Sequence, residues 1–161
     1  HAAEPTTQAD EAKRIASGGM PAEKARYQLA DTATGRPVRL HRGSIRCNAF
    51  RQKWILIGNE EDFARNVSYL GEIWYAEADS LTGPWRKAVK VATHPNYSFY
   101  NPVHHEFFDE EDGRVIYFEG TYTRQFSRSP VPTPRYDYNQ IMYRLDLSRV
   151  EPRVAPSAAG G

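Results

Sequence analysis

Short strand-like segments follow one another along most of this chain, and no long amphipathic helical stretch competes with them. They are rich in aromatic and β-branched residues, and turn residues such as Gly83-Pro84 and Asp112-Gly113 separate them. The segments are ARYQLAD, GSIRCNAF, KWILIGNE, GEIWYAEAD, RKAVKVAT, HHEFF, RVIYFEGTYT and NQIMYRLDLS. This pattern predicts an all-β fold of consecutive antiparallel strands.

The predicted strands fall into two similar units, each roughly sixty residues long. Aligning the units places Arg46 opposite His104 and Asn48 opposite Glu106. Each unit offers three or four consecutive antiparallel strands, which is the composition of a β-propeller blade. We therefore predict two antiparallel sheets of four strands each.

The boundaries of these units set the domain organisation. Blade 1 is expected over about 38–95 and blade 2 over about 99–150, within a β domain spanning 26–150. The segment 1–25 is expected to be a flexible arm or linker with a helical turn or two in ADEAKRIA, and 151–161 a flexible tail.

Two blades cannot close a ring, and an open pair leaves an apolar flank and unpaired strand edges. Three arrangements would solve this problem. The chain is part of a longer five-bladed propeller, or the sheets pack as a small sandwich, or copies of the chain self-associate. We favour the first.

Charge and composition exclude several partners. The net charge is +1, with Lys and Arg scattered among acidic residues, so no basic stripe indicates nucleic acid. No apolar run approaches the ~20 residues that span a bilayer. Cys47 is the single cysteine, which excludes an internal disulfide, and its alternating surroundings predict a buried, inert thiol.

The stretch GEIWYAEADSLTGPW resembles the five-bladed β-propeller glycosidases of the arabinanase and xylosidase type, glycoside hydrolase family 43 and its relatives. Blades of that family commonly carry an apolar strand, a turn like A-x-S-x-x-x-GPW and a return strand. The matching residues are Ala76, Ala78, Asp79, Ser80, Leu81, Gly83, Pro84 and Trp85. The turn marks the propeller superfamily more specifically than it marks any activity.

A second resemblance lies in HHEFFDEEDGRVIYFEG. A late blade of the family often begins with a His before a strand, and that His helps to hold a central metal or water cluster. His104 occupies the matching place, whereas His105 and Glu106 replace the family's small polar residues. The resemblance covers about 40–150 and implies the last two blades, with the catalytic carboxylates largely in earlier ones. The resemblance identifies no certain cofactor, but it is compatible with a structural calcium ion.

The adjacent histidines cannot share one task, because successive strand residues point to opposite faces. His104 is the candidate metal and substrate ligand, or else one His caps the strand while the other packs beside Tyr100. Glu106, two residues from His104, would share its face and either orient the imidazole or form an ion pair with Arg46. Glu106 and Glu119 are the candidate catalytic carboxylates.

Candidate sugar contacts lie on strands and in aromatic loops. Arg46 and Asn48 would face a central channel, where Arg46 binds a hydroxyl or carboxylate unless it is simply an exposed strand arginine. Rings in HPNYSFYNP and TPRYDYNQ are placed in connections, where they stack on sugars or close the interface between blades. The predicted substrate-binding residues are Arg46, Asn48, Tyr100, Asn101, His104, Tyr136 and Tyr138.

Taken together, these features predict a carbohydrate-active protein, related to propeller glycosidases, that acts on or binds a polysaccharide or oligosaccharide in an extracellular or periplasmic setting. The alternative is a non-catalytic module that binds glycans or proteins through its aromatic loops. A third possibility is an interaction domain whose open strand edge pairs with another chain. An enzyme requires carboxylates converging on a cleft, whereas a lectin-like module requires exposed rings without them.

Overall fold

The computed structural model describes residues 6–64, 68–94 and 96–151. One helix and eight strands are present in these ranges: α1 Gln8–Ala16, β1 Ala30–Asp31, β2 Leu40–Asn48, β3 Lys53–Glu60, β4 Glu72–Ala78, β5 Lys87–Thr93, β6 Ser98–His104, β7 Val115–Thr123 and β8 Tyr138–Asp146. Short 3₁₀ turns occur at Ala22–Lys24, Glu106–Phe108, Glu111–Gly113 and Leu147–Arg149. No helix in the described ranges is long and apolar enough to cross a membrane.

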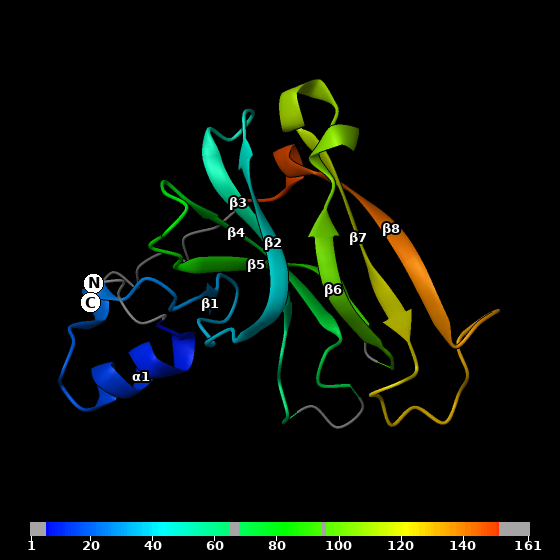
Figure 1. Ribbon diagram of the computed structural model, residues 1–161, viewed down its shortest axis with the longest axis horizontal. Coiled ribbons are helices and arrows are strands. Elements are labelled where there is room, and N and C mark those ends of the chain that lie inside the picture. Colours follow the sequence, from blue (N-terminus) through cyan, green and yellow to red (C-terminus); the bar gives the residue numbers. More distant parts are fainter. Residues whose placement is uncertain (1–5, 65–67, 95, 152–161) are drawn as a thin grey trace, which may run out of the picture.

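The strands form two sheets (Figure 1). The first has the order β1-β5-β4-β3-β2 and the second the order β6-β7-β8. All neighbours are antiparallel except β1, which pairs with β5 in parallel. The predicted mostly-β fold with two sheets is confirmed, but the expectation of four strands in each is wrong. The first sheet gains β1 from the N-terminal segment, the second has three strands, and the sheets do not close into a ring.

The strand β6 lies earlier in the chain than the sequence predicted. HHEFF was expected to be a strand, whereas β6 ends at His104 and Glu106–Phe108 is a 3₁₀ turn. The burial of the aromatic residues explains where β6 begins and ends. Phe99, expected in a connection, is fully buried, and its N–H donates to the carbonyl of Leu70 at 2.9 Å, whereas Phe107 and Phe108 are exposed. Extending the strand beyond His104 would therefore bury no additional ring.

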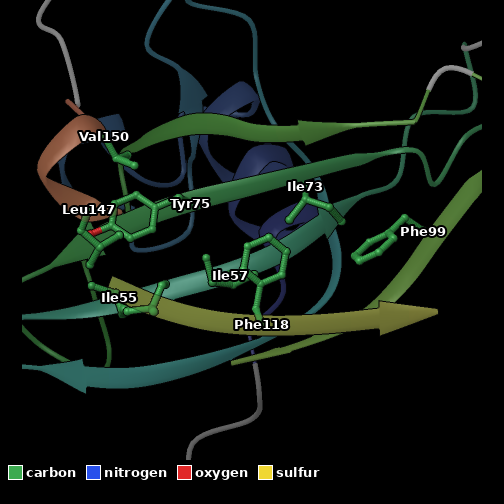
Figure 2. Packing of buried hydrophobic residues seen from close by; sticks show 9 residues of the cluster. Ile55, Ile57, Ile73, Tyr75, Phe99, Phe118, Leu147 and Val150 are labelled. Carbon is green, nitrogen blue, oxygen red and sulfur yellow. The ribbon is translucent and has the colours of Figure 1, made fainter. Parts of the chain in front are cut away.

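The main core lies between the two sheets (Figure 2). Alternate residues of β3 and β4 point toward the second sheet, which contributes alternate residues of β6 and β7 and the turn after β8. The buried members are Ile55, Ile57, Ile73, Tyr75, Phe99, Ile116, Phe118, Leu147 and Val150. Burying each large apolar side chain stabilises the fold by about 1.5–3 kcal/mol, so this shared core joins the two sheets.

The N-terminal segment covers the opposite face of the first sheet. Leu29 and Val38 pack with Trp74 and Trp85 in a second buried cluster. Helix α1 joins this layer through the Glu11 carboxylate, which accepts hydrogen bonds from the backbone N–H groups of residues 26 and 27, each at 2.8 Å. Residues 8–16 thus form a docked helix where the sequence predicted a flexible arm over 1–25. The predicted tail, apart from residue 151, falls outside the described ranges.

The strand β2 of the first sheet and the strand β6 of the second run side by side in the same direction (Figure 1). The Ser44 hydroxyl accepts a hydrogen bond from the His104 N–H at 2.7 Å, and Arg46 Nε lies 3.9 Å from Glu106 Oε2, two residues further along both segments. Side-chain contacts therefore connect these strands. Cys47, on β2, is exposed rather than buried as the sequence predicted, because the alternation places it on the outer face.

Candidate functional site

A cleft of about 300 Å³ opens at the end of the sheets where β2 and β6 begin. This volume is at the lower end of the range for small-molecule sites, about 300–1,000 Å³. The connections β3–β4 and β7–β8, at the lower end of Figure 1, complete its walls. The lining residues are His41, Arg42, Tyr69, Leu70, Tyr100, Asn101 and Phe126.

The β2 wall of the cleft carries a β-bulge. Leu40 pairs with Glu60 and Arg42 with Asn59, so His41 is an extra residue between two consecutive positions of β3. The buried side chain of Asn59 accepts a hydrogen bond from the Arg42 N–H at 3.2 Å. A bulge redirects the side chains of its strand, and here it displays His41 and Arg42 at the cleft.

The other walls are irregular as well. The pairing of β6 with β7 shifts between Tyr100 and Val103, where Asn101 has a φ of 53°. Phe126, in the turn after β7, has a φ of 62°. Asn tolerates this left-handed backbone, but a bulky residue rarely adopts it, and such strain costs about 1–3 kcal/mol and is concentrated at functional sites. The bulge at His41, Asn101 and Phe126 all lie on the cleft, although left-handed backbone also occurs away from it, for example at Gln52.

Aromatic rings form most of the cleft surface. Tyr100 contacts Phe126 edge-on, with centroids 5.7 Å apart, and Tyr69 stacks on Phe63 at 4.9 Å. The Tyr100 hydroxyl is hydrogen-bonded to the Tyr138 hydroxyl. Burial raises the pKa of Tyr100 to about 12, and the hydrogen bond to Tyr138 acts in the same direction. The phenol therefore keeps its proton at neutral pH, and it shares a hydrogen bond with Tyr138 in which either hydroxyl can be the donor.

Buried polar contacts hold the loops beneath the cleft together. The Ser68 and Ser98 hydroxyls are 3.1 Å apart, and both side chains are buried. Ser68 also forms an isolated β-bridge with Ser127, next to Phe126. These contacts join the β3–β4 connection to both β6 and the turn after β7. They hold the segments that form the cleft walls in fixed positions relative to one another.

The structure brings some of the predicted sugar-binding residues together and separates others. Tyr100 and Asn101 line the cleft, and Tyr138 contacts Tyr100. Tyr136 is highly exposed but is not a lining residue. Asn48 is buried at the far end of β2, where its amide donates to the Gly113 carbonyl and accepts from the Arg51 N–H, both at 2.8 Å. Its contacts are those of a structural residue.

The two adjacent histidines contact different acidic residues. His104 is buried, and its Nε2 lies 2.8 Å from Asp109 Oδ1. His105 Nε2 lies 3.1 Å from Glu119 Oε1. Of the two roles left open for Glu106, the structure does not show the contact with His104, because the chain turns into a 3₁₀ helix after His105 and brings Asp109 to the imidazole instead. In the described ranges, no three His, Cys, Asp or Glu side chains cluster in a way that would hold a metal ion.

Arg46 and Glu106 face each other at 3.9 Å, the ion pair that was the structural alternative in the sequence. Both side chains are substantially exposed, at 39% and 63%, so the pair contributes little to stability. Neither residue lines the cleft, and neither does Glu119. The candidate carboxylates of the sequence therefore lie away from the aromatic rings.

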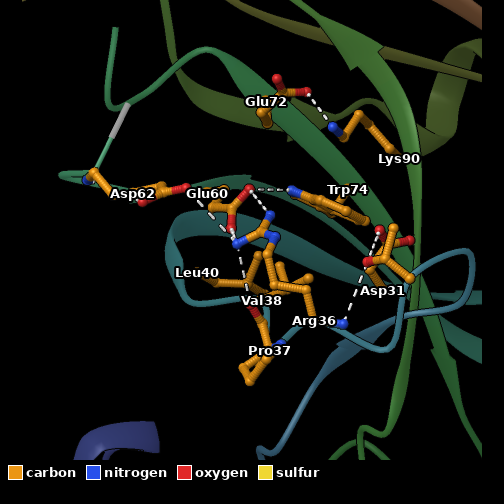
Figure 3. A network of polar contacts seen from close by, with 12 residues as sticks. Asp31, Arg36, Pro37, Val38, Leu40, Glu60, Asp62, Glu72, Trp74 and Lys90 are labelled. Atoms are coloured by element: carbon orange, nitrogen blue, oxygen red, sulfur yellow. Dashed lines mark hydrogen bonds and ion pairs between the residues drawn. The ribbon is translucent and has the colours of Figure 1, made fainter. Parts of the chain in front are cut away.

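Two buried carboxylates that the sequence did not single out lie on the N-terminal side of the first sheet (Figure 3). Glu60, the last residue of β3, is 1% exposed. It binds Arg36 at 2.6 Å and accepts a hydrogen bond from the Trp74 indole at 3.0 Å. Glu72 lies 3.3 Å from Lys90 Nζ. This network attaches the N-terminal segment to the sheet.

Sequence reasoning missed five of the cleft residues: His41, Arg42, Tyr69, Leu70 and Phe126. The bulge that displays His41 depends on how β2 pairs with β3, and the sequence carries no local sign of it. The Pro-rich character of QFSRSPVPTP was the one available signal for a loop near Phe126.

Comparisons with protein-family models, with curated proteins and with solved structures find no match for this chain.

Proposed function

We propose that this chain binds carbohydrate, holding a short saccharide segment in the cleft between β2 and β6. The observation that carries the proposal is the combination of aromatic rings and hydrogen-bonding side chains on irregular backbone, with no carboxylate among the described lining residues.

The lining residues suit a sugar. Flat rings such as Tyr100 and Phe126 offer apolar surface for the C–H face of a pyranose. Asn101 and the Tyr100 phenol offer donors and acceptors for ring hydroxyls. Burial of a ring against aromatic side chains, with a few placed polar groups, is the usual composition of a small-molecule site.

We also propose that the two sheets are adjacent blades of a propeller of the glycosidase type, working outside the cytoplasm. Two features support this proposal. Each sheet contains a run of consecutive antiparallel strands, and the strands that begin these runs, β2 and β6, lie side by side in the same direction. The turn ending at Gly83, Pro84 and Trp85 is the motif that resembles such blades.

Binding is favoured over hydrolysis by the described residues of this chain. Acid-pair hydrolysis needs two carboxyl groups flanking the scissile bond. Glu106 faces Arg46 and Glu119 faces His105, and neither lines the cleft. The non-catalytic alternative is therefore the stronger one for this cleft.

The test is calorimetric titration of the chain with xylotriose, arabinotriose and trigalacturonate. Phe126→Ala removes an exposed cleft ring, and Phe107→Ala removes a comparably exposed ring outside the cleft. We expect at least one saccharide to bind, and Phe126→Ala to weaken it about three- to tenfold, equivalent to ~0.5–1.5 kcal/mol. Phe107→Ala should leave binding unchanged. Absence of binding to all three sugars, or equal effects of the two variants, would contradict the proposal.

A further inference from the structure

The inference that follows deepens the proposed function and rests on it. We infer that the cleft selects saccharides carrying an anionic group, with the guanidinium of Arg42 as the residue that recognises it. The chemistry in question is a sugar carboxylate, as in a uronic acid, or a sugar sulfate.

The ion pairing of Arg42 differs from that of its neighbours in sequence. The flanking arginines each face a carboxylate: Arg36 faces Glu60 at 2.6 Å, Arg39 faces Glu61 at 3.2 Å, and Arg46 faces Glu106, in the turn after β6, at 3.9 Å. In the described ranges, no carboxylate lies within ion-pair distance of Arg42, and its side chain is exposed. Its charge is therefore available to a ligand.

The backbone of Arg42 is fixed although its side chain is exposed. The bulge at His41 sets its direction, and the buried Asn59 side chain accepts its N–H at 3.2 Å. The guanidinium itself presents a planar fork of donors, which matches the two oxygens of a carboxylate and also suits sulfate.

The rest of the cleft complements a negative charge. His41 and Tyr100 also line the cleft, and their imidazole and phenol each carry a hydrogen-bond donor. The described lining residues include no Asp or Glu that would repel an anion. Arg42 comes from β2, whereas Tyr100 and Phe126 come from the second sheet and the turn after β7. An acidic sugar would thus place its charge on one wall and its ring on the other.

The experiment compares ligands that differ only in charge. Calorimetric titrations would use trigalacturonate, its methyl ester, and a sulfated galactose disaccharide with its unsulfated parent. We expect wild-type protein to bind an anionic member of one pair at least tenfold more tightly than its neutral partner. Arg42→Gln should abolish that preference and leave the affinity for the neutral partner within about twofold.

Arg39→Gln is the matched control, because Arg39 is 62% exposed, precedes β2 and is already paired with Glu61. It should keep the wild-type preference. A tenfold preference for trigalacturonate over its ester would identify carboxylate as the anionic group, and a preference confined to the sulfated sugar would identify sulfate.

The outcomes separate the two proposals. Equal affinity for charged and neutral partners, or a preference that survives Arg42→Gln, would overturn the anionic inference while saccharide binding stands. If no saccharide binds, neutral or charged, the proposed function fails and the inference fails with it. Far-ultraviolet circular dichroism of each variant checks that the fold is unchanged.

Discussion

Among single residues, Glu11 connects the N-terminal helix to the rest of the fold. It is 3% exposed, and its carboxylate accepts hydrogen bonds from the N–H groups of Arg26 and Tyr27 and the amide of Gln28. Burial alone would raise the pKa of Glu11, but these hydrogen bonds outweigh it and the pKa is lowered. The ionised form is therefore the one that stabilises the folded state.

We expect Glu11→Gln to destabilise the protein by about 1.5–3 kcal/mol at pH 7, because a charged acceptor is lost from buried donors. A carboxyl with a lowered folded-state pKa contributes stability above its unfolded value, about 4.3, and loses it as the pH falls further. The difference in the free energy of unfolding between wild type and Glu11→Gln should therefore become smaller in acid. Urea unfolding at pH 7 and at several pH values below 4.3 measures this difference.

The matched control for this prediction is Glu23→Gln, since Glu23 is exposed on the same segment. It should change stability by less than about 0.5 kcal/mol. A gap between wild type and Glu11→Gln that stays constant with pH would contradict the role assigned to the charge.

His94 is the second residue with a pH-dependent contribution. Its ring stacks on Phe99 at 5.0 Å, and its Nε2 lies 2.8 Å from the Tyr143 hydroxyl. Burial lowers the pKa of His94 to about 4. The unfolded chain binds a proton at this residue below about pH 6.5 and the folded chain does not, so stability falls as the pH drops from 6.5 to 4.

His94→Phe should remove this acid sensitivity. We expect wild type to lose about 1–3 kcal/mol between pH 7 and pH 4 through His94, a value reduced from the full shift because the ring is partly exposed. The stability of His94→Phe should therefore fall by about 1–3 kcal/mol less than that of wild type over the same pH range. Tyr143→Phe is the control, because it removes the hydrogen bond and keeps the titrating ring. Identical pH profiles for wild type and His94→Phe in thermal unfolding would refute the prediction.

Among the elements, β6 and β7 pack closely because β7 contains a glycine. A Cβ added at Gly120 would lie 2.5 Å from Cε1 of Phe99. That ring is fully buried and lies between His94 and Tyr143, so it cannot move aside. The absence of a side chain at position 120 is therefore a condition for Phe99 to fill the core.

Gly120→Ala is expected to destabilise the protein by about 1–3 kcal/mol through overpacking. Gly19→Ala serves as the comparison, since the nearest heavy atoms to an added Cβ there are at 3.5 Å, an ordinary contact. Urea unfolding measures both changes: a shift in the denaturation midpoint without a change in the m-value reports the loss of stability. Equal stability of the two variants would show that the β6–β7 packing adjusts more readily than the static contacts indicate.

The same elements show what sequence alone can predict. KWILIGNE and GEIWYAEAD became β3 and β4, as predicted, because each contains a short continuous run of β-branched and aromatic residues that is buried on both faces of the sheet. The segment ARYQLAD was predicted to be a strand, but only its last two residues form β1, in parallel with β5. This extent and direction could not be predicted, since the pairing of Ala30 with Lys87 is a long-range contact. β6 was misplaced because Phe99 stands among Asn, Ser and Pro, and only its distant partners reveal that it is buried.

Only two of the seven described residues that line the cleft were predicted, for the same reason. Tyr100 and Asn101 were identified from their composition, as aromatic and amide residues near turn signals. His41 and Arg42 were missed because the bulge arises from the register of β2 against β3. The left-handed backbone of Phe126 is likewise a property of the folded loop.

In the molecule as a whole, the shared core implies that the two sheets unfold together. The chain has three tryptophans, Trp54, Trp74 and Trp85, which all belong to the first sheet or its connections. Phe118 lies on β7 in the second sheet and is 1% exposed in the shared core. Tryptophan fluorescence therefore reports on one sheet while a substitution is made in the other.

Phe118→Ala should destabilise the protein by about 3–5 kcal/mol. If the sheets form one cooperative unit, the fluorescence midpoint and the circular-dichroism midpoint in urea will fall together. A fluorescence midpoint that stays at the wild-type value while the circular-dichroism signal changes would show that the sheets unfold separately.

The bulges at His41 and Asn101 have a consequence for directed evolution. They place the binding side chains at strand ends, outside the two buried clusters that carry most of the apolar packing. Substitution there changes little of what keeps the chain folded. A library randomised at His41, Arg42, Asn101 and Phe126 should therefore retain a high fraction of folded members. The two-sheet fold can then serve as a scaffold for selecting binders of other small ligands.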